Sequence, residues 1–253
     1  MDISTKEILD YCTCPLLYQY KYINKYMHER TLIQKFEYDI RKIFFGFHSY
    51  PYNKQEFPPL KTFLKQWHND WDKRVTSQEF ISTISTLSKS DAYARTRGLY
   101  KKGIETIEQF YDNNNSYAGA PLLINKDYFI NIGKHNLKGT LHLVKEVLDG
   151  NTKSLEIIHY RIATPQNILR RDVELTANSL AFRLLMGVSE QRIVEYDILS
   201  GQHFITKRNE SDYKDLVKII NCIDKALHNK IFYPVLNYRC LQCPYNNKCK
   251  NGG

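Results

Sequence analysis

The stretch Cys240-Leu-Gln-Cys243-Pro-Tyr-Asn-Asn-Lys-Cys249 brings three cysteines together in the pattern C-x2-C-x5-C. One short segment can therefore supply three thiolates, which are soft ligands that select zinc or an iron–sulfur cluster, and either centre needs four ligands. The fourth ligand must come from elsewhere in the chain, and Cys14, which precedes Pro15, is the natural candidate. We therefore expect a metal centre that ties the C-terminal cysteine segment to the N-terminal one.

Length and composition set the broad class. The chain has 253 residues, enough for one large domain or two small ones with a real core. It contains no apolar run near the roughly 18–20 residues of a membrane helix, and its N-terminus lacks the apolar region of a signal peptide. Six cysteines, four of them at metal-like spacing, favour a reducing compartment over disulfide bonds. We expect a cytoplasmic protein without a membrane partner.

The chain is basic and rich in aromatic residues, with a formal charge of +9, 19 Tyr and 12 Phe. Basic charge attracts phosphates and aromatic faces stack on unpaired bases, although a soluble surface and an aromatic core would explain the same composition. The charge gathers at Arg95, Arg97, Lys101 and Lys102, on one segment with a helical pattern. This group is either a solvated helix face or a nucleic-acid surface.

Apolar periodicity predicts the order of the elements. Ser4 or Thr5, followed by Glu7, forms a capping-box signal for the first helix, and Asp149-Gly150 is a strong turn signal between two strands. Residues 112–115 predict a loop. We predict helices at residues 4–20, 31–45, 60–71, 91–111, 170–186 and 211–227. We predict strands at residues 128–132, 137–147, 155–162, 193–199 and 203–207. The order indicates an α/β core preceded by a helical insertion.

Five segments carry a resemblance to a known family. They are Tyr11-Cys-Thr-Cys14-Pro15-Leu-Leu-Tyr18-Gln-Tyr20, Leu137-Lys-Gly139-Thr-Leu-His142, Leu155-Glu-Ile-Ile-His159-Tyr160-Arg161, Glu174-Leu-Thr-Ala-Asn178, and Phe232-Tyr233-Pro234 before the cysteine segment. The chain resembles the PD-(D/E)XK nuclease superfamily, in particular its iron–sulfur RecB/AddB-like exonuclease branch, which includes the CRISPR-associated RecB-like nucleases. The resemblance extends over nearly the whole chain, and the cysteine pattern is its most specific part.

The resemblance implies one nuclease-like domain over residues 1–253, with a mixed central sheet flanked by helices. Its parts would be an N-terminal cluster-side helix, a helical insertion, a nuclease-like core, and a C-terminal helix with the cluster loop, at residues 1–30, 31–120, 121–210 and 211–253. It also implies a [4Fe–4S] cluster on Cys14, Cys240, Cys243 and Cys249, with zinc as the alternative. Cys12 could replace Cys14, and we interpret Cys222 as a small buried apolar residue.

The catalytic residues that the resemblance implies have all changed. Active relatives hold a divalent cation on one Asp and on the Asp or Glu two residues before a Lys, and these positions are His142, His159 and Arg161 here. The helix positions for Gln and Tyr have become Glu174 and Asn178. Magnesium prefers oxygen ligands, and an arginine cannot act as a base. We therefore expect no catalytic residue to retain its function and no divalent cation in the core site.

Other interpretations of this centre remain open. His142, His159 and Glu174 could form a rewired transition-metal site, or they could be relics without chemical function. A migrated carboxylate could be Glu146, four residues after His142 on the same strand, whereas Glu156 should face away from His159. The family's upstream histidine has no convincing counterpart, because Tyr38 lies near its position and His48 has a different context.

We expect a catalytically degenerate RecB-like protein that binds DNA, single-stranded or at ends, or serves as an accessory subunit of a helicase, recombination, replication or defence machine. The residues expected to contact DNA are Arg161, as a phosphate clamp, with Arg170, Arg171, Arg95, Arg97, Lys101 and Lys102. One alternative is an active, metal-dependent DNA exonuclease with shifted ligands. Another is a protein-interaction or inhibitory module that does not bind DNA.

Overall fold

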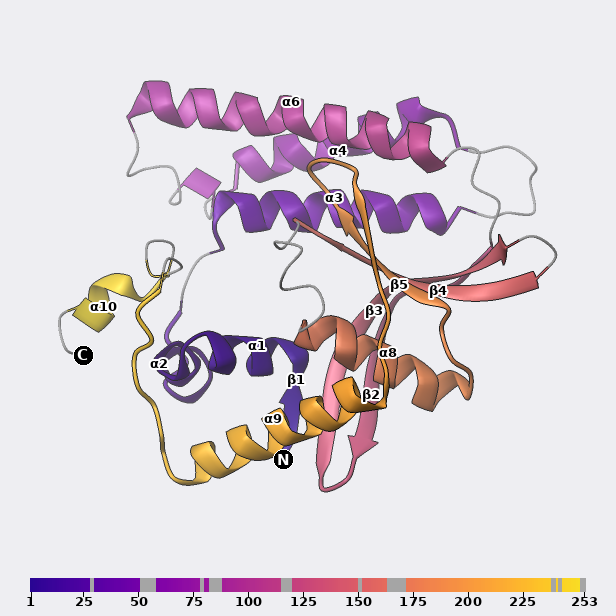
Figure 1. Ribbon diagram of the computed structural model, residues 1–253. Coiled ribbons are helices and arrows are strands. Elements are labelled where there is room, and N and C mark those ends of the chain that lie inside the picture. The colour runs from indigo at the N-terminus through magenta and orange to yellow at the C-terminus, as the bar shows by residue number, and fades with distance from the viewer. Residues whose placement is uncertain are drawn as a thin grey trace.

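A computed structural model describes residues 1–27, 30–50, 58–77, 80–81, 88–114, 120–149, 152–162, 172–237, 240 and 243–250. Over these residues the chain is an α/β protein, in which helices cover both faces of a mixed sheet (Figure 1). The strands are β1 (Asp2–Ser4), β2 (Pro121–Ile132), β3 (His135–Asp149), β4 (Thr152–Arg161), β5 (Arg192–Asp197) and β6 (His203–Thr206). The helices are α1 (Thr5–Thr13), α2 (Pro15–Tyr18), the π-helix η1 (Gln19–Ile23), α3 (Leu32–His48), α4 (Leu60–Val75), α6 (Lys89–Asn114), α8 (Val173–Met186), α9 (Glu210–His228) and α10 (Asn246–Lys250).

Strand β3 is the centre of the sheet. It pairs antiparallel with β2 along one edge, and on the other edge it pairs parallel with β1 and then antiparallel with β4. Strand β5 is parallel to β4, and β6 closes the order antiparallel to β5. A parallel neighbour requires a crossover connection, which α8 supplies between β4 and β5. Strands β4 and β5 are therefore neighbours, and α8 lies between them in the chain.

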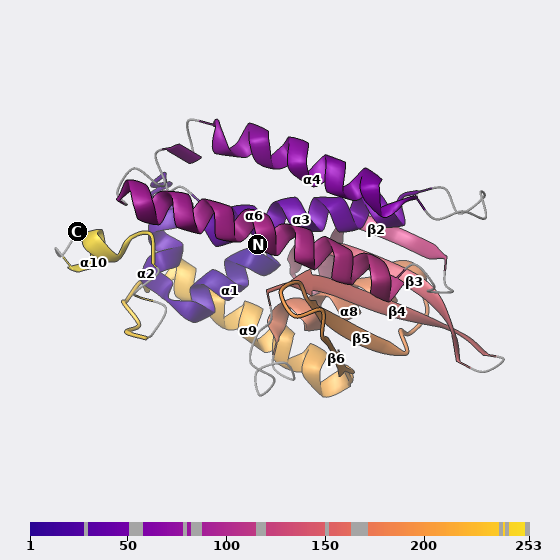
Figure 2. The same cartoon turned by 90° about the horizontal axis from the view of Figure 1, so that it is seen from above.

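Two cores lie on opposite faces of the sheet. Helices α1, α8 and α9 cover one face with α3, α4 and α6 over the other, as Figures 1 and 2 show. The period-2 alternation of a strand sends Ile157 to the α1-α8-α9 side and Ile158 to the α3-α4-α6 side. Aromatic side chains fill much of the second core, and the rings of Phe44 and Phe110 stack with centroids 3.7 Å apart.

Tight packing orients the long helix α6. Gly103 of α6 lies against Trp67 of α4, so closely that an added Cβ would stand 2.1 Å from a carbon of that indole ring. The indole Nε1 donates to the carbonyl of Tyr100 at 3.1 Å. The face of α6 that carries Gly103 therefore points inward, and the first half of the helix presents its other side to solvent.

Most predicted elements are confirmed with ends that shift by up to four residues, but β2 begins at Pro121, seven residues before its predicted start. The predicted mixed α/β arrangement with flanking helices is confirmed, and so is the capping box, in which Ser4 Oγ accepts from the backbone of Glu7 at 3.2 Å. No helix among the described residues is long and apolar enough to cross a bilayer. Gly150 of the predicted turn lies outside the described residues, as do Arg170 and Arg171.

Two predictions about the helices were wrong, and one strand was missed. The predicted helix at 4–20 breaks at Cys14, whose backbone is extended with φ −166° and ψ 111°, because Pro15 disfavours a helical residue before it. Strand β1 was not predicted. Residues 112–114 continue α6 instead of forming a loop, and the buried Asn114 side chain donates to the carbonyl of Phe110 at 2.8 Å.

A buried histidine connects the helical layer to the sheet. Nε2 of His48, at the end of α3, lies 2.8 Å from the hydroxyl of Tyr160 on β4. Burial, with a smaller contribution from Lys145, lowers the pKa of His48 to about 3. The folded protein therefore keeps this imidazole neutral at pH values where an unfolded chain protonates it.

This pKa predicts an acid-sensitive contribution to stability. The His48 contribution is fully present above pH 6.5 and is lost as the pH falls toward 3, because only the unfolded state then binds the proton. Replacing His48 by Gln should reduce the pH dependence of the free energy of unfolding by up to about 1.4 kcal/mol per pH unit. Urea unfolding of both proteins between pH 7 and pH 5 measures this. Parallel curves would show that His48 is not the group responsible.

Candidate functional site

The segment after α9 runs back past α2, so that α10 lies near α2 (Figures 1 and 2). The hydroxyl of Tyr11 donates to the carbonyl of Ile231 at 2.9 Å, and the backbone N–H of Leu16 donates to the carbonyl of Tyr233 at 3.2 Å. Further on, the Asn237 amide donates to the carbonyl of Thr13 at 3.4 Å. These contacts bring the C-terminal cysteines to the break between α1 and α2.

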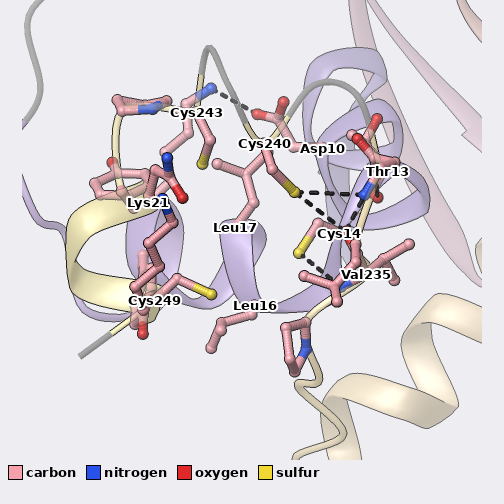
Figure 3. Close-up of a pocket in the computed structure, with 18 of the residues that line it drawn as sticks. Asp10, Thr13, Cys14, Leu16, Leu17, Lys21, Val235, Cys240, Cys243 and Cys249 are labelled. Atoms are coloured by element: carbon pink, nitrogen blue, oxygen red, sulfur yellow. Dashed lines mark hydrogen bonds and ion pairs between the residues drawn. The ribbon is translucent and has the colours of Figure 1, made fainter. Parts of the chain in front are cut away.

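The four predicted cysteine ligands line one cavity of about 680 Å³. Cys14 comes from the α1–α2 break, Cys240 and Cys243 come from the returning segment, and Cys249 comes from α10 (Figure 3). All four are half-buried and form no disulfide bond. The wall of the cavity also contains apolar side chains, among them Leu16, Leu17 and Val235. The predicted ligands are therefore gathered from both ends of the chain.

Backbone hydrogen bonds already point at two of the sulfurs. The N–H of Val235 donates to Cys14 Sγ at 3.4 Å, and the N–H of Asn237 donates to Cys240 Sγ at 3.4 Å, as the dashed lines in Figure 3 show. Hydrogen bonds to the ligand sulfurs are one of the features that set the properties of cysteine-ligated clusters. The returning segment thus contacts two of the predicted ligands through its backbone.

The thiols also influence one another electrostatically. Burial raises the pKa of the Cys243 thiol, a hydrogen bond from the backbone of Tyr245 lowers it, and the three neighbouring cysteines raise it further. A bound cation would relieve the repulsion between the thiolates. Among the described residues, no three His, Cys, Asp or Glu side chains form a group that could hold a single metal ion.

The remaining cysteines are not part of this cavity. Cys14, and not Cys12, is the N-terminal cysteine among the lining residues. Cys222 is exposed on α9, so its interpretation as a buried apolar residue was wrong. Its neighbour Ile223 takes the inward position on that helix.

A second polar centre forms where the sequence predicts the altered catalytic residues. The rings of His142 on β3 and His159 on β4 stack with their centroids 4.1 Å apart and an interplanar angle of 9°. The backbone N–H of Tyr160 donates to His142 Nδ1 at 3.0 Å, which places any proton of the neutral ring on Nε2. Burial, followed by the influence of His159, lowers the pKa of His142 well below its usual value. His142 is therefore a neutral, stacked ring in this core.

Arg161 is engaged inside the protein. One guanidinium nitrogen lies 2.7 Å from a carboxylate oxygen of Asp172 and also forms an ion pair with Glu195, while a second nitrogen lies 3.7 Å from Glu174. Only 13% of the Arg161 side chain is exposed, and Glu195 is fully buried. Burial works against the charged form, but Asp172 and Glu195 outweigh it and raise the pKa of Arg161. The structure thus gives Arg161 internal carboxylate partners where the sequence suggests a phosphate clamp.

Glu174 lies close to both His159 and Arg161. One of its carboxylate oxygens lies 3.4 Å from His159 Nε2, and 26% of its side chain is exposed. Burial alone would raise the pKa of Glu174, but His159, then Arg161 and Arg41, lower it to about 2. Glu174 is therefore an anion at neutral pH, in the first turn of α8, where the helix dipole favours negative charge.

Sequence reasoning missed two of these carboxylates. Asp172 is the N-cap of α8 and accepts from the backbone of Leu175 at 2.9 Å, whereas the sequence prediction began this helix at residue 170 and placed Asp172 inside it. Glu195 lies beside His159 in the parallel ladder of β4 and β5, and a carboxylate between Val194 and Tyr196 in a predicted strand was the signal there.

The other candidates for this centre lie elsewhere. Glu146 pairs with Lys153 at 2.8 Å, at the far end of the β3–β4 ladder. Glu156 does face away from His159, because the two lie three positions apart on β4 and side chains alternate along a strand. Tyr38 is exposed.

The predicted basic group lies on the first half of α6, the outer helix at the top of Figure 1. Arg95, Arg97 and Lys101 are exposed, and none of the three forms an ion pair with another described residue. Lys102 is half-buried, with Glu105 at 3.5 Å. Tyr93, one turn before Arg97, is 66% exposed. Three cations and an aromatic ring are thus open to solvent on one helix.

Two comparisons of the sequence with known proteins were made, and neither finds a relative. A scan against protein-family models finds no family that matches the chain, and a search of the curated proteins finds no significant match.

Proposed function

We propose that the chain is a RecB-like member of the PD-(D/E)XK nuclease superfamily that binds nucleic acid without hydrolysing it. The observation that carries the proposal is the group of exposed basic residues on α6, in which Arg97 and Lys101 share one side of the helix and Arg95 lies on another. Cations without internal partners are available to phosphates, and they release counterions from the nucleic acid when they bind. The exposed ring of Tyr93 offers a stacking surface for an unpaired base, which favours single strands or ends over a continuous duplex.

A cysteine-ligated [4Fe–4S] cluster is the second part of the proposal. Support comes from the all-thiol donor set, from the hydrogen bonds to the sulfurs of Cys14 and Cys240, and from a cavity of about 680 Å³, which is larger than one ion requires. Cys14, Cys240, Cys243 and Cys249 would hold the cluster. Its role would be structural, because it would join the α1–α2 break to the segment after α9.

The absence of hydrolysis is the third part. The centre does not suit Mg²⁺, because His142 and His159 are stacked on each other and the carboxylates next to them are paired with Arg161. Without an acidic pair free to bind a cation, no group among the described residues of this centre would prepare a water molecule for attack on a phosphodiester.

An accessory role in a protein complex is the second candidate function. The observation that favours it is a group of apolar side chains at the end of α8, Leu184, Leu185, Met186 and Val188, which are 40–54% exposed. Exposed apolar groups of this kind often mark contacts between proteins. A Leu184→Ser, Leu185→Ser variant that loses a stoichiometric protein partner and keeps its oligonucleotide affinity would support this role.

Metal analysis tests the cluster. Anaerobically purified protein should contain about four irons per chain and little zinc. Cys243→Ser should lose the iron because it removes a thiolate from the cavity, whereas Cys222→Ser is a matched control that should keep it. Zinc in place of iron would refute the cluster and retain the metal link. Full iron content in Cys14→Ser would refute the link between the chain ends.

Oligonucleotide binding tests the surface on α6. The variant Arg95→Ala, Arg97→Ala, Lys101→Ala should bind single-stranded DNA about tenfold or more weakly, and its slope of log K against log salt should fall by about 2. The control Lys207→Ala, Lys214→Ala, Lys225→Ala removes the same charge from other exposed positions and should bind as the parent does. Equal losses in the two variants would show that net charge, and not this surface, determines binding.

A nuclease assay tests the absence of hydrolysis. Labelled single-stranded DNA should stay intact with Mg²⁺ or Mn²⁺, because the carboxylates of the centre are already paired. Degradation that disappears in His159→Ala, but persists in a control variant of the exposed His68, would establish the active-nuclease alternative.

A further inference from the structure

Strand β2 is a long edge of the sheet. One of its sides pairs with β3, and among the described residues no strand pairs with the other side. Residues 126–132 keep a single register with β3 and contain no proline. Proteins usually protect such an edge with a bulge, a proline or a covering segment, because its free N–H and C=O groups can pair with another chain.

The backbone groups that face this free edge belong to Asp127, Phe129 and Asn131. Across the ladder Asn131 is opposite Asn136, whose N–H donates to the carbonyl of Met1 at 3.0 Å, on the side away from β2. Asn131 and Asn136 are therefore a non-hydrogen-bonded pair, so the N–H and C=O of Asn131 point away from β3. The two kinds of pair alternate along an antiparallel ladder, which gives Phe129 and Asp127 the same direction.

The side chains of the same three residues are exposed, on the part of the β2–β3 hairpin that reaches away from α3, α4 and α6 (Figure 1). Phe129 is 56% exposed. Asp127 accepts from the hydroxyl of Thr140 at 2.7 Å through Oδ1, and the Asn131 amide donates to Asn136 at 3.2 Å. The second carboxylate oxygen of Asp127 and the second amide hydrogen of Asn131 have no hydrogen-bond partner among the described residues.

We propose that β2 pairs antiparallel with the β2 strand of a second copy of this chain, about a two-fold axis at Phe129. In this register Phe129 is opposite its own copy, and Asp127 of each chain is opposite Asn131 of the other. All the outward N–H groups of the two strands then donate to a carbonyl across the axis. The two phenyl rings form an aromatic cross-strand pair, the Asn131 amide donates to the Asp127 carboxylate, and no like charges stand opposite each other.

The self-complementarity of this edge favours a second copy over a different chain. A two-fold contact requires the same surface to match itself in reverse. Shifting one strand by two residues in either direction would place Phe129 opposite Asp127 or Asn131, so that a ring would meet a polar group. Only the register centred on Phe129 pairs ring with ring and amide with carboxylate. The inference depends neither on the cysteine centre nor on nucleic-acid binding.

Sedimentation equilibrium measures the association directly. The parent chain, with a monomer mass of 29.9 kDa, should form a reversible dimer with a dissociation constant in the micromolar range, because edge pairing alone makes a small interface. Phe129→Lys should weaken the dimer at least about tenfold, since the axis places the two new charges opposite each other. Ile205→Lys is the matched control and should leave the dimer unchanged, because Ile205 is also 56% exposed but lies on β6, at the other edge of the sheet.

Disulfide cross-linking tests the register. The background for this experiment replaces the exposed Cys12 and Cys222 by serine. Phe129→Cys in this background should link two copies, because directly opposite residues of a hydrogen-bonded pair have Cα atoms about 5.5 Å apart. Asp127→Cys should not link them, because the equivalent residue of the second copy lies about 13 Å further along the strand. Non-reducing electrophoresis, with the background protein as control, separates the two results.

Three results would overturn the proposal. They are a parent that remains a monomer even at millimolar concentration, a dimer that Phe129→Lys and Ile205→Lys weaken equally, and a disulfide that forms through position 127 in preference to 129. Protection of β2 from hydrogen exchange only after a different protein is added would assign this edge to that protein instead of to a second copy.

Discussion

The hydrogen bonds between the segment after α9 and the break between α1 and α2 are the constraint on which the cysteine site depends. Pro15 breaks the first helix at Cys14, and the backbone groups exposed there pair with the returning chain, as in the bond from Leu16 to Tyr233. The break is in turn held against the sheet, because β1 precedes α1 directly and lies parallel to β3. A metal bound at this place would connect residues about as far apart in sequence as the chain allows. Removing so much loop-closure entropy from the unfolded chain stabilises the fold.

Two groups of acidic or potentially anionic side chains occur in the described structure, the four cysteines of the cavity and the carboxylates next to β4. Their surroundings differ. The thiols of Cys14, Cys240, Cys243 and Cys249 line one open cavity, and backbone N–H groups donate to two of the sulfurs. The carboxylates next to β4 are paired with the guanidinium of Arg161. The proposed cluster would be an external partner for the thiols, whereas these carboxylates already have an internal one.

Much of the fold was predictable because its signals are local. The apolar stripe of residues 211–227 and the capping residues of α1 depend on neighbours within a few turns, and they appear as expected. The grouping of the four cysteines was also predictable, because their spacing is typical of metal ligands. Strand β1 was missed because three residues are too few to show alternation, and only its ladder with β3 defines it. Asp172 and Glu195 were missed because their role depends on the register of β4 and β5 and on the docking of α8, which sequence spacing does not reveal.

The most direct test of the central claim, that a metal centre joins the two ends of the chain, is hydrogen–deuterium exchange before and after removal of the metal. The relevant peptides cover residues 5–23 and 231–250, with β3 and β4 as internal references. We predict that exchange in both end segments rises together when the metal is removed, while the sheet stays protected. A rise confined to one segment, or no change in either, would contradict the account.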